Sequence, residues 1–136
     1  MTTPRYLLDT NVLSALIKQP QGPLAQRLAT CAEGSYCTSI IVASELRYGA
    51  QRKGSARLTA YVEAVLDSLE VVPLEAPTDR HYAEIRTFLE STGQPIGQND
   101  LLIAAQARAL GLVVVTGNTR EFLRVPDLNV ENWDAP

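Results

Sequence analysis

The sequence predicts an α/β sandwich with a mostly parallel central sheet. Short apolar runs alternate with longer stretches in which apolar residues recur every three or four positions, the pattern of alternating strands and helices. The run Leu112-Val113-Val114-Val115 is apolar throughout, which is typical of a central parallel strand covered on both faces. The length of 136 residues suits one domain covering positions 1–136.

The first half of the chain contains two strand predictions, each followed by helical periodicity. Polar or small residues end each apolar run and suit a helix start, and Ser39 is a candidate N-cap. The predicted elements, in order, are a strand at 6–8, a helix at 12–18, a helix from Leu24 to Ala32 ended by Glu33-Gly34, a strand at 36–38 and a helix from Ile40 to Gly49.

The second half continues the alternation, which implies right-handed crossovers between parallel strands. The stretch 101–110 is apolar on nearly every face, so this helix is expected to be buried. The predicted elements are a helix at 58–69, a strand at 70–74, a helix capped by Thr78 and closed by Gly93, the buried helix 101–110, a strand at 112–115, a short helix at 120–123 and an extended piece at 128–130.

Composition excludes several classes of protein. The 12 Lys and Arg residues against 15 Asp and Glu residues give a net charge of −3. A protein that binds nucleic acid by bulk electrostatics is strongly basic, so that class is excluded, whereas an enzyme that meets phosphate through a metal ion is not. Cys31, Cys37 and the single histidine, His81, form neither a disulfide framework nor a zinc pattern.

No apolar run is long enough for a secretory leader or a membrane span. We therefore expect a soluble cytoplasmic protein that does not associate with membranes.

Polar residues follow two of the predicted strands. Asp9-Thr10-Asn11 follows the first, and Thr116-Gly117-Asn118-Thr119 follows the fourth. Ligands of open parallel sheets bind at the carboxyl ends of the strands. Two further acids stand in apolar surroundings: Glu45 lies within a helical run and Asp100 immediately precedes the buried helix.

Each acid taken alone has a simple structural explanation. Asp9 can cap a helix, Asp100 can stabilise a helix N-terminus and Glu45 can face solvent. If Asp9, Glu45 and Asp100 converge at one sheet edge, repulsion raises at least one pKa unless a cation is bound. Mg²⁺ or Mn²⁺ suits such a site, because hard cations take carboxylate oxygens and leave positions for a substrate phosphate.

The order and spacing of these motifs resemble those of PIN-domain ribonucleases, and within them of the VapC toxins of bacterial toxin–antitoxin pairs, almost from end to end. The resemblance implies a PIN-domain-like α/β/α sandwich. The motifs that carry it are Leu8-Asp9-Thr10-Asn11, Ser44-Glu45-Leu46-Arg47-Tyr48-Gly49, Pro95-Ile96-Gly97-Gln98-Asn99-Asp100 with Leu101-Leu102-Ile103-Ala104-Ala105, Val115 to Phe122, and Val130-Glu131-Asn132-Trp133.

The resemblance also implies the site residues. Asp9, Glu45 and Asp100 are the expected metal ligands, and the exit of the last strand supplies a fourth catalytic group. Many PIN domains have an aspartate where this chain has Asn118, which offers a carbonyl oxygen without charge. Glu121 is the candidate for the missing charge.

Thr10 and Thr116 are candidate supporting hydroxyls, and turn or capping roles are equally open for both.

RNA binding requires local cations in this acidic chain. The segment 47–57 contains four basic residues and no acid, and it begins beside Glu45. A solvated helix end is the alternative interpretation of its charges. The candidate RNA contacts are Arg47, Arg52, Lys53 and Arg120, and Arg124 carries the same ambiguity as Arg120.

The resemblance implies a Mg²⁺- or Mn²⁺-dependent endoribonuclease toxin that cleaves structured RNA such as tRNA and inhibits translation and growth. A VapB-type antitoxin is expected to neutralise it by placing its C-terminal segment in the acidic groove. The expected state is a homodimer that meets DNA only through the antitoxin.

Two other classes remain as alternatives. A haloacid-dehalogenase-like phosphatase would need a second aspartate where this chain has Asn11, and a receiver-like or nucleotide-binding module would need a glycine-rich phosphate loop of the usual spacing, which is missing.

Overall fold

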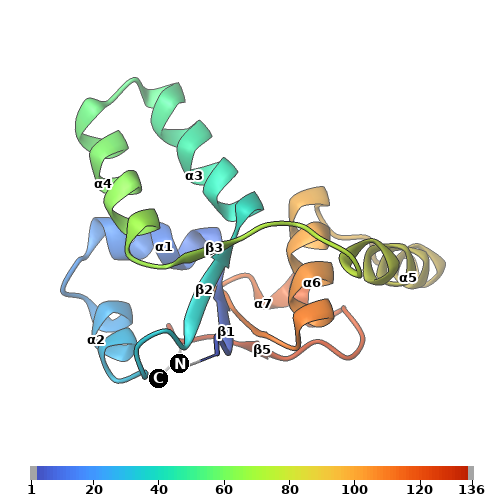
Figure 1. Cartoon of the computed structure of the whole chain (residues 1–136). Helices are drawn as coiled ribbons and strands as arrows, with labels where there is room; N and C mark the ends of the chain where they lie inside the picture. Colours follow the sequence, from blue (N-terminus) through green and yellow to red (C-terminus); the bar gives the residue numbers. More distant parts are fainter. Residues whose placement is uncertain (1–2, 135–136) are drawn as a thin grey trace.

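A parallel sheet runs through the middle of the molecule in the computed structural model, which describes residues 3–134 (Figure 1). The strand order is β3-β2-β1-β4-β5, and all four strand pairings within the described residues are parallel. The mostly parallel sheet predicted from the sequence is confirmed. The strands are β1 (Tyr6–Leu8), β2 (Tyr36–Ser39), β3 (Glu70–Val72), β4 (Val113–Val115) and β5 (Val130–Glu131).

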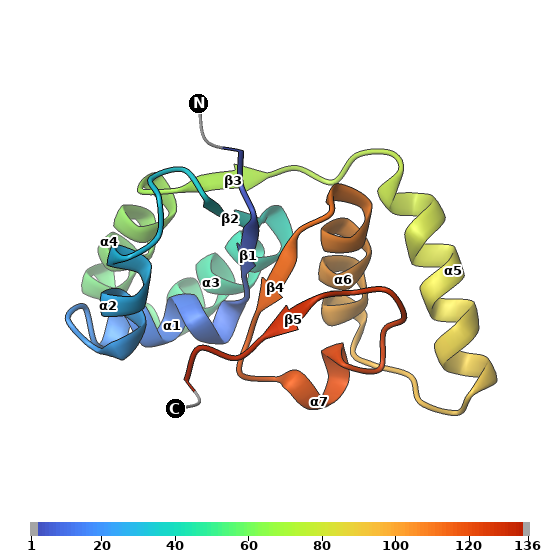
Figure 2. The same cartoon turned by 90° about the horizontal axis from the view of Figure 1, so that it is seen from below.

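Helices cover both faces of this sheet, which confirms the α/β/α layering. Helices α1 to α4 lie on one side and α5 and α6 on the other (Figure 2). Right-handed crossovers explain this division, because the chain moves from β1 to β3 in one direction and then returns to β4 beyond β1. The helices are α1 (Thr10–Lys18), α2 (Pro23–Ala29), α3 (Ile40–Lys53), α4 (Ala56–Asp67), α5 (Thr78–Ser91), α6 (Gln98–Leu110) and α7 (Thr119–Phe122).

The centre of the sheet is the centre of the hydrophobic core. Leu7 on β1 is in register with Cys37 on β2 and Val114 on β4, and all three side chains are fully buried. Helix α6 supplies the other wall through a run of buried residues from Ile103 to Ala107, as its apolar sequence predicted. None of the helices described for residues 3–134 has the length and apolarity that a membrane span requires.

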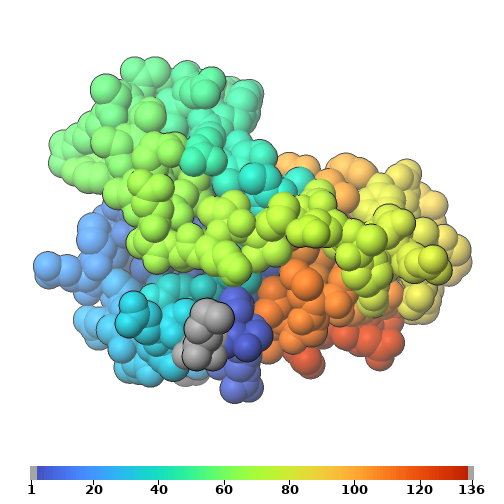
Figure 3. Space-filling model, viewed as in Figure 1, coloured from blue at the N-terminus to red at the C-terminus, as the bar shows by residue number. Residues whose placement is uncertain are grey.

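The helix predicted to end at Gly49 continues to Lys53, so that prediction was wrong. Glycine inside a helix costs only about 1 kcal/mol relative to alanine, which the surrounding helical turns offset. The true terminator is Gly54, whose φ of +63° is the left-handed conformation that closes a helix. As a result α3 and α4 form a long hairpin that stands out from the body of the molecule (Figure 3).

Thr78 does not cap α5, contrary to the prediction. Pro77 occupies the N-cap position without a side-chain hydrogen bond, and Thr78 is the first helical residue and is buried. Helix α6 begins three residues before the predicted start at Leu101, because extended Gly97 serves as its N-cap. The remaining differences in boundary are of one to three residues: α1 begins at Thr10, α2 begins at Pro23 and ends at Ala29, β2 ends at Ser39, α4 begins at Ala56 and ends at Asp67, β3 ends at Val72, β4 begins at Val113, α7 lies at Thr119–Phe122, and β5 lies at Val130–Glu131.

Candidate active site

Two neighbouring strands deliver the polar residues of the site to one edge of the sheet. Leu8 at the end of β1 is in register with Val115 at the end of β4. Asp9 and Thr116, the residues that follow these two strands, therefore lie side by side at this edge. Helices α1 and α7 begin at the same edge of the sheet (Figure 2). This is the carboxyl edge, where open parallel sheets bind ligands.

Asp9 is buried, with only 3% of its surface exposed, and its carboxylate faces other site residues. It occupies the N-cap position of α1 but makes no side-chain capping bond. Its Oδ2 instead accepts hydrogen bonds from Thr116 Oγ1 at 2.8 Å and Asn11 Nδ2 at 3.1 Å. The capping explanation for Asp9 is thus not what the structure shows. Burial raises the pKa of Asp9 above its usual range, and the nearby charge of Glu45 adds to the rise.

Thr116 connects the two strand ends. Its hydroxyl donates to Asp9 and accepts from the backbone N–H of Asn118 at 2.9 Å and from Asn11 Nδ2 at 3.2 Å. Asn11 also accepts from the backbone N–H of Gly117 at 2.8 Å. Asn11 was missing from the predicted site residues, although its place directly after the first strand's Asp-Thr pair was a signal that could have found it.

Glu45 reaches the site from α3, and Thr10 holds it there. Thr10 Oγ1 donates a 2.8 Å hydrogen bond to Glu45 Oε1 across 35 residues of sequence. Glu45 is half-buried, so a fully solvent-facing position is excluded. The charge of Glu45 also acts on the carboxyl groups of Asp9 and Asp100, which places all three acids in one electrostatic cluster.

Asn118 joins Asp100 to Glu121. Its Nδ2 donates to Asp100 Oδ2 at 3.1 Å and to Glu121 Oε2 at 2.9 Å. Glu121 also accepts a 3.3 Å hydrogen bond from the backbone N–H of Gly97, which caps α6. The structure therefore places both candidates for the fourth group, Asn118 and Glu121, beside Asp100.

The acids of this cluster compete for protons. Burial raises the pKa of Asp100 to about 8, and its hydrogen bond to Glu121 and the charges of Asp9, Glu121 and Glu45 contribute further. The same hydrogen bond lowers the pKa of Glu121. Like charges held together at a partly buried edge are stabilised by protonation or by a bound cation.

The donor set fits Mg²⁺ or Mn²⁺ better than zinc. It consists of carboxylate, amide and hydroxyl oxygens, which hard cations prefer. Among residues 3–134 no group of three or more His, Cys, Asp or Glu side chains lies close enough together to hold a metal ion as they stand. This arrangement is compatible with Mg²⁺, which proteins usually bind through one or two carboxylates. The ion keeps several water ligands, and a substrate phosphate can replace them.

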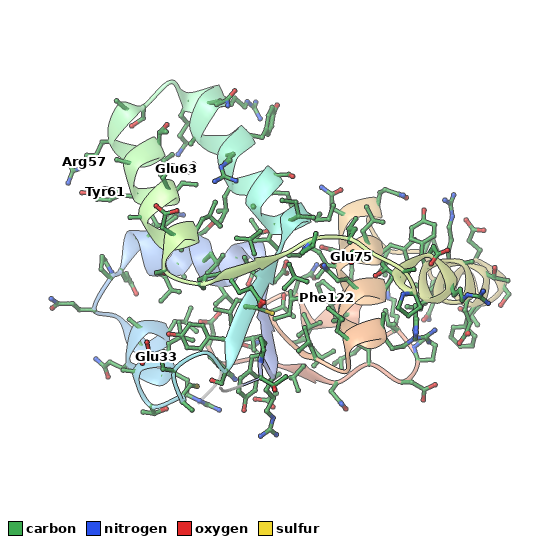
Figure 4. All side chains as sticks on the ribbon, viewed as in Figure 1. Glu33, Arg57, Tyr61, Glu63, Glu75 and Phe122 are labelled. Carbon is green, nitrogen blue, oxygen red and sulfur yellow. The ribbon has the colours of Figure 1, made fainter. Side chains whose placement is uncertain are left out.

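The predicted RNA-contacting cations lie in different settings. Arg47 is tied to Glu63 of α4 by two hydrogen bonds of 2.8 and 2.9 Å, and Figure 4 shows Glu63 on the side of α4 that faces α3. Arg52 and Lys53 are exposed in the last turn of α3. Arg120 is exposed on α7, whereas Arg124 donates to the backbone carbonyl of Pro95 at 3.1 Å.

A groove of about 230 Å³ opens beside Glu45, between α1 and the α3–α4 hairpin. Thr10 and Glu45 lie at its acidic end, and Lys18 and Lys53 also line it. Its remaining lining residues are Ser14, Ile17, Leu46, Gly49, Ala50, Leu58 and Val62. The groove therefore combines mostly apolar walls with charges of both signs.

Fold and site together define an α/β protein with an acidic centre at the carboxyl edge of a parallel sheet. Residues 6–128 match the PIN domain family model, and the chain belongs to the PIN domain family, in its VapC group. The tRNA(fMet)-specific endonuclease VapC of Shigella flexneri is 35% identical over 130 residues, which cover 95% of this chain and 98% of that protein.

Two further comparisons agree. Ribonuclease VapC2 of Haemophilus influenzae is 38% identical with the same coverage of both chains. The crystal structure of VapBC2 from Rickettsia felis, bound to a DNA fragment from their promoter, matches with a TM-score of 0.89 and 37% identity over 95% of this chain and 98% of that chain.

Proposed function

We propose that this chain is a single-domain, Mg²⁺- or Mn²⁺-dependent endoribonuclease and the toxin of a toxin–antitoxin pair in the cytoplasm. The observation that carries the proposal is the electrostatic cluster of Asp9, Glu45 and Asp100 at the carboxyl edge of the sheet: burial raises the pKa of Asp9 and of Asp100, and the charge of Glu45 adds to both rises. A cation removes that repulsion and gives a phosphodiester a place to bind.

Asp9, Glu45 and Asp100 would hold the cation, with Asn118 or Glu121 as the fourth group. When bound, the metal supplies an activated water and stabilises the charge that develops on the phosphate oxygens. The chain's own residues position these acids. Thr116 and Asn11 orient Asp9, Thr10 orients Glu45, and Asn118 holds the carboxyls of Asp100 and Glu121.

Structured RNA, with tRNA as its main example, is the proposed substrate, and its cleavage would inhibit translation and growth. The Shigella flexneri relative is named for the tRNA that it cuts. Exposed Arg52, Lys53 and Arg120 are the proposed phosphate contacts, because they supply local positive charge to a chain of net charge −3. Arg47 is the fourth proposed contact, and it would exchange Glu63 for a phosphate when RNA binds.

The proposed partner is a VapB-type antitoxin, since the Rickettsia felis relative was crystallised as a VapBC complex on promoter DNA. The groove beside Glu45 suits an apolar antitoxin segment, with Lys18 and Lys53 available for its acidic groups. The toxin is proposed to form a homodimer and to meet DNA only through the antitoxin.

Incubation of the purified chain with total tRNA tests the proposal. We expect cleavage with Mg²⁺ or Mn²⁺ and none with chelator, and we expect Asp9→Asn and Asp100→Asn to abolish it. Asp79→Asn is the matched control, because Asp79 is also an acid in the first turn of a helix but is exposed on α5. Cleavage that persists in Asp100→Asn, or that ignores the chelator, would overturn the proposal.

A further inference from the structure

Tyr48 is an exposed aromatic side chain one turn beyond Glu45. On a helix, residues three apart share a face, and their rise along the axis is about 4.5 Å. Tyr48 is 65% exposed, more than Tyr61 at 45% or Phe88 at 44%. Its hydroxyl forms no hydrogen bond with any residue between 3 and 134. Among residues 3–134, Tyr48 therefore neither packs in the hydrophobic core nor takes part in a hydrogen-bond network, so the fold gives no structural reason for an aromatic residue at this position.

The other faces of α3 are already occupied. Leu46 and Ala50 point towards α1 and α4, where they line the groove beside Glu45. Arg47 is bound to Glu63 on α4. Tyr48 and Arg52, four residues apart, share the remaining face, and Arg52 is exposed without an ion pair among residues 3–134. This open face begins at the acidic cluster and runs towards the tip of the hairpin.

The cation of this face is Arg52, which is exposed. The neighbouring cations lie elsewhere: Arg47 is paired with Glu63, Lys53 lines the groove beside Glu45, and Arg57 lies over the ring of Tyr61 on α4. An exposed aromatic ring beside an exposed cation matches the way proteins bind single-stranded nucleic acid, with a phosphate on the cation and a base stacked on the ring. Single-stranded RNA therefore suits this face, because it offers a base to the ring of Tyr48 and a phosphate to Arg52.

We propose that Tyr48 is an RNA-contacting residue that stacks on an unpaired base next to the bond that is cut, while Arg52 binds a phosphate further along the same strand. This inference rests on the proposed ribonuclease function and assigns the position of the substrate on the enzyme. It also predicts that the cleaved bond lies in a loop or other unpaired region, because a paired base does not offer its face to the ring.

Binding of a fluorescein-labelled single-stranded RNA tests the proposal, in protein that carries Asp100→Asn to prevent cleavage. We expect Tyr48→Ala to weaken binding about tenfold, the lower part of the range for loss of one base–aromatic stack, and Tyr48→Phe to bind normally. Tyr61→Ala is the matched control. Tyr61 lies on the outer side of α4, away from α3, with Arg57 over its ring (Figure 4), and its removal should leave binding unchanged.

Cleavage kinetics in the parent chain provide a second measurement. We expect Tyr48→Ala to raise KM with a smaller change in kcat, and the melting temperature to stay the same because the ring is exposed. An RNA with 2-aminopurine at the unpaired position should lose fluorescence on binding to the Tyr48 protein and not to Tyr48→Ala.

Equal RNA binding by Tyr48→Ala and Tyr61→Ala would overturn the assignment of Tyr48. A Tyr48→Ala variant that lost antitoxin binding but kept RNA binding would also overturn the assignment. In that case this face of α3 would be a protein-binding surface. Failure of the parent chain to cut any RNA would instead count against the proposed function, so the two failures are distinguishable.

Discussion

Thr116 Oγ1 donates a buried 2.8 Å hydrogen bond to Asp9 Oδ2, joining residues that are 107 positions apart in the sequence. The bond exists because β1 and β4 are adjacent and in register, so that their first residues beyond the sheet face each other. The same hydroxyl accepts the N–H of Asn118 and thereby connects Asp9 to the group beside Asp100. Thr116 is therefore placed to set the orientation of both halves of the acidic cluster.

Replacement of Thr116 by valine should reduce activity by about 10- to 100-fold, the usual effect of removing a residue that orients a metal-binding carboxylate. Valine keeps the shape of threonine but cannot donate to Asp9. Steady-state cleavage of tRNA measures the effect, with kcat and the Mg²⁺ requirement followed together. Thr116→Ser keeps the hydroxyl and should restore most of the activity. If valine and serine behaved alike, Thr116 would have no positioning role.

The parts of the fold that depend on local pattern were predictable from the sequence. The apolar run that contains β4 indicated a parallel sheet, which the structure confirms, and the polar residues after β1 and β4 do lie together at one edge of it. Asp9, Glu45 and Asp100 stood out because burying a carboxylate is costly without a partner, and each of them has partners here.

Features that depend on pairing in space were not predictable. Arg47 belongs to a basic segment in sequence, yet its bond to Glu63 forms only because α3 and α4 fold into a hairpin. Asn11 gains its importance from Thr116 and Gly117, which are more than 100 residues away. The end of α3 was misplaced because two glycines compete for that role and only the backbone conformation of Gly54 decides it.

The metal-free protein should lose stability as the pH rises from 6 to 9. The pKa of Asp100 is about 8 in the folded chain against 3.8 for the ordinary carboxyl, so the folded state holds a proton that the unfolded state releases. The contribution of Asp100 to the free energy of unfolding is fully present below about pH 4 and is lost as the pH rises through 8. Thermal unfolding in the presence of chelator should show a melting temperature a few degrees lower at pH 9 than at pH 6.

Asp100→Asn removes the titrating group, so its melting temperature should depend much less on pH over the same range. Mg²⁺ should stabilise the parent chain more at pH 9 than at pH 6, because the ionised carboxyl binds the cation. A parent chain and an Asp100→Asn variant with the same pH slope would contradict the assignment of the proton to Asp100.

Arg108 should be important for stability, because it joins α6 to two other segments. Its side chain is only 7% exposed and donates to His81 Nδ1, to Glu84 Oε1 and to the backbone carbonyl of Pro126. Arg108→Ala removes the donor to His81 Nδ1 and to the Pro126 carbonyl, both partly buried, and should lower the free energy of unfolding by about 2–3 kcal/mol, measured by urea denaturation. Arg86→Ala is the control: its pair with Glu90 is exposed, and little change is expected. Similar losses for both variants would refute the role of Arg108.

The two cysteines should report opening of the central sheet. Cys37 is fully buried in β2, and burial, with a smaller effect of the Glu70 charge, raises the pKa of its thiol to about 12. Thiol reagents attack the thiolate, so Cys37 should react only when β2 separates from its neighbours, whereas half-buried Cys31 should react in the native protein. Mass spectrometry of iodoacetamide-treated protein should therefore show one rapid and one slow modification.

Cys31→Ser should abolish the rapid modification of the native protein and leave the slow one, which urea accelerates. If the acidic cluster binds a metal, Mg²⁺ should slow the labelling of Cys37, because Asp9 follows the strand that pairs with β2 and binding to the folded state suppresses opening. Rapid labelling of Cys37 in the native chain would show that the sheet is less stable than its burial indicates. An effect of Mg²⁺ that persisted in a variant with both Asp9→Asn and Asp100→Asn would show that the ion acts elsewhere.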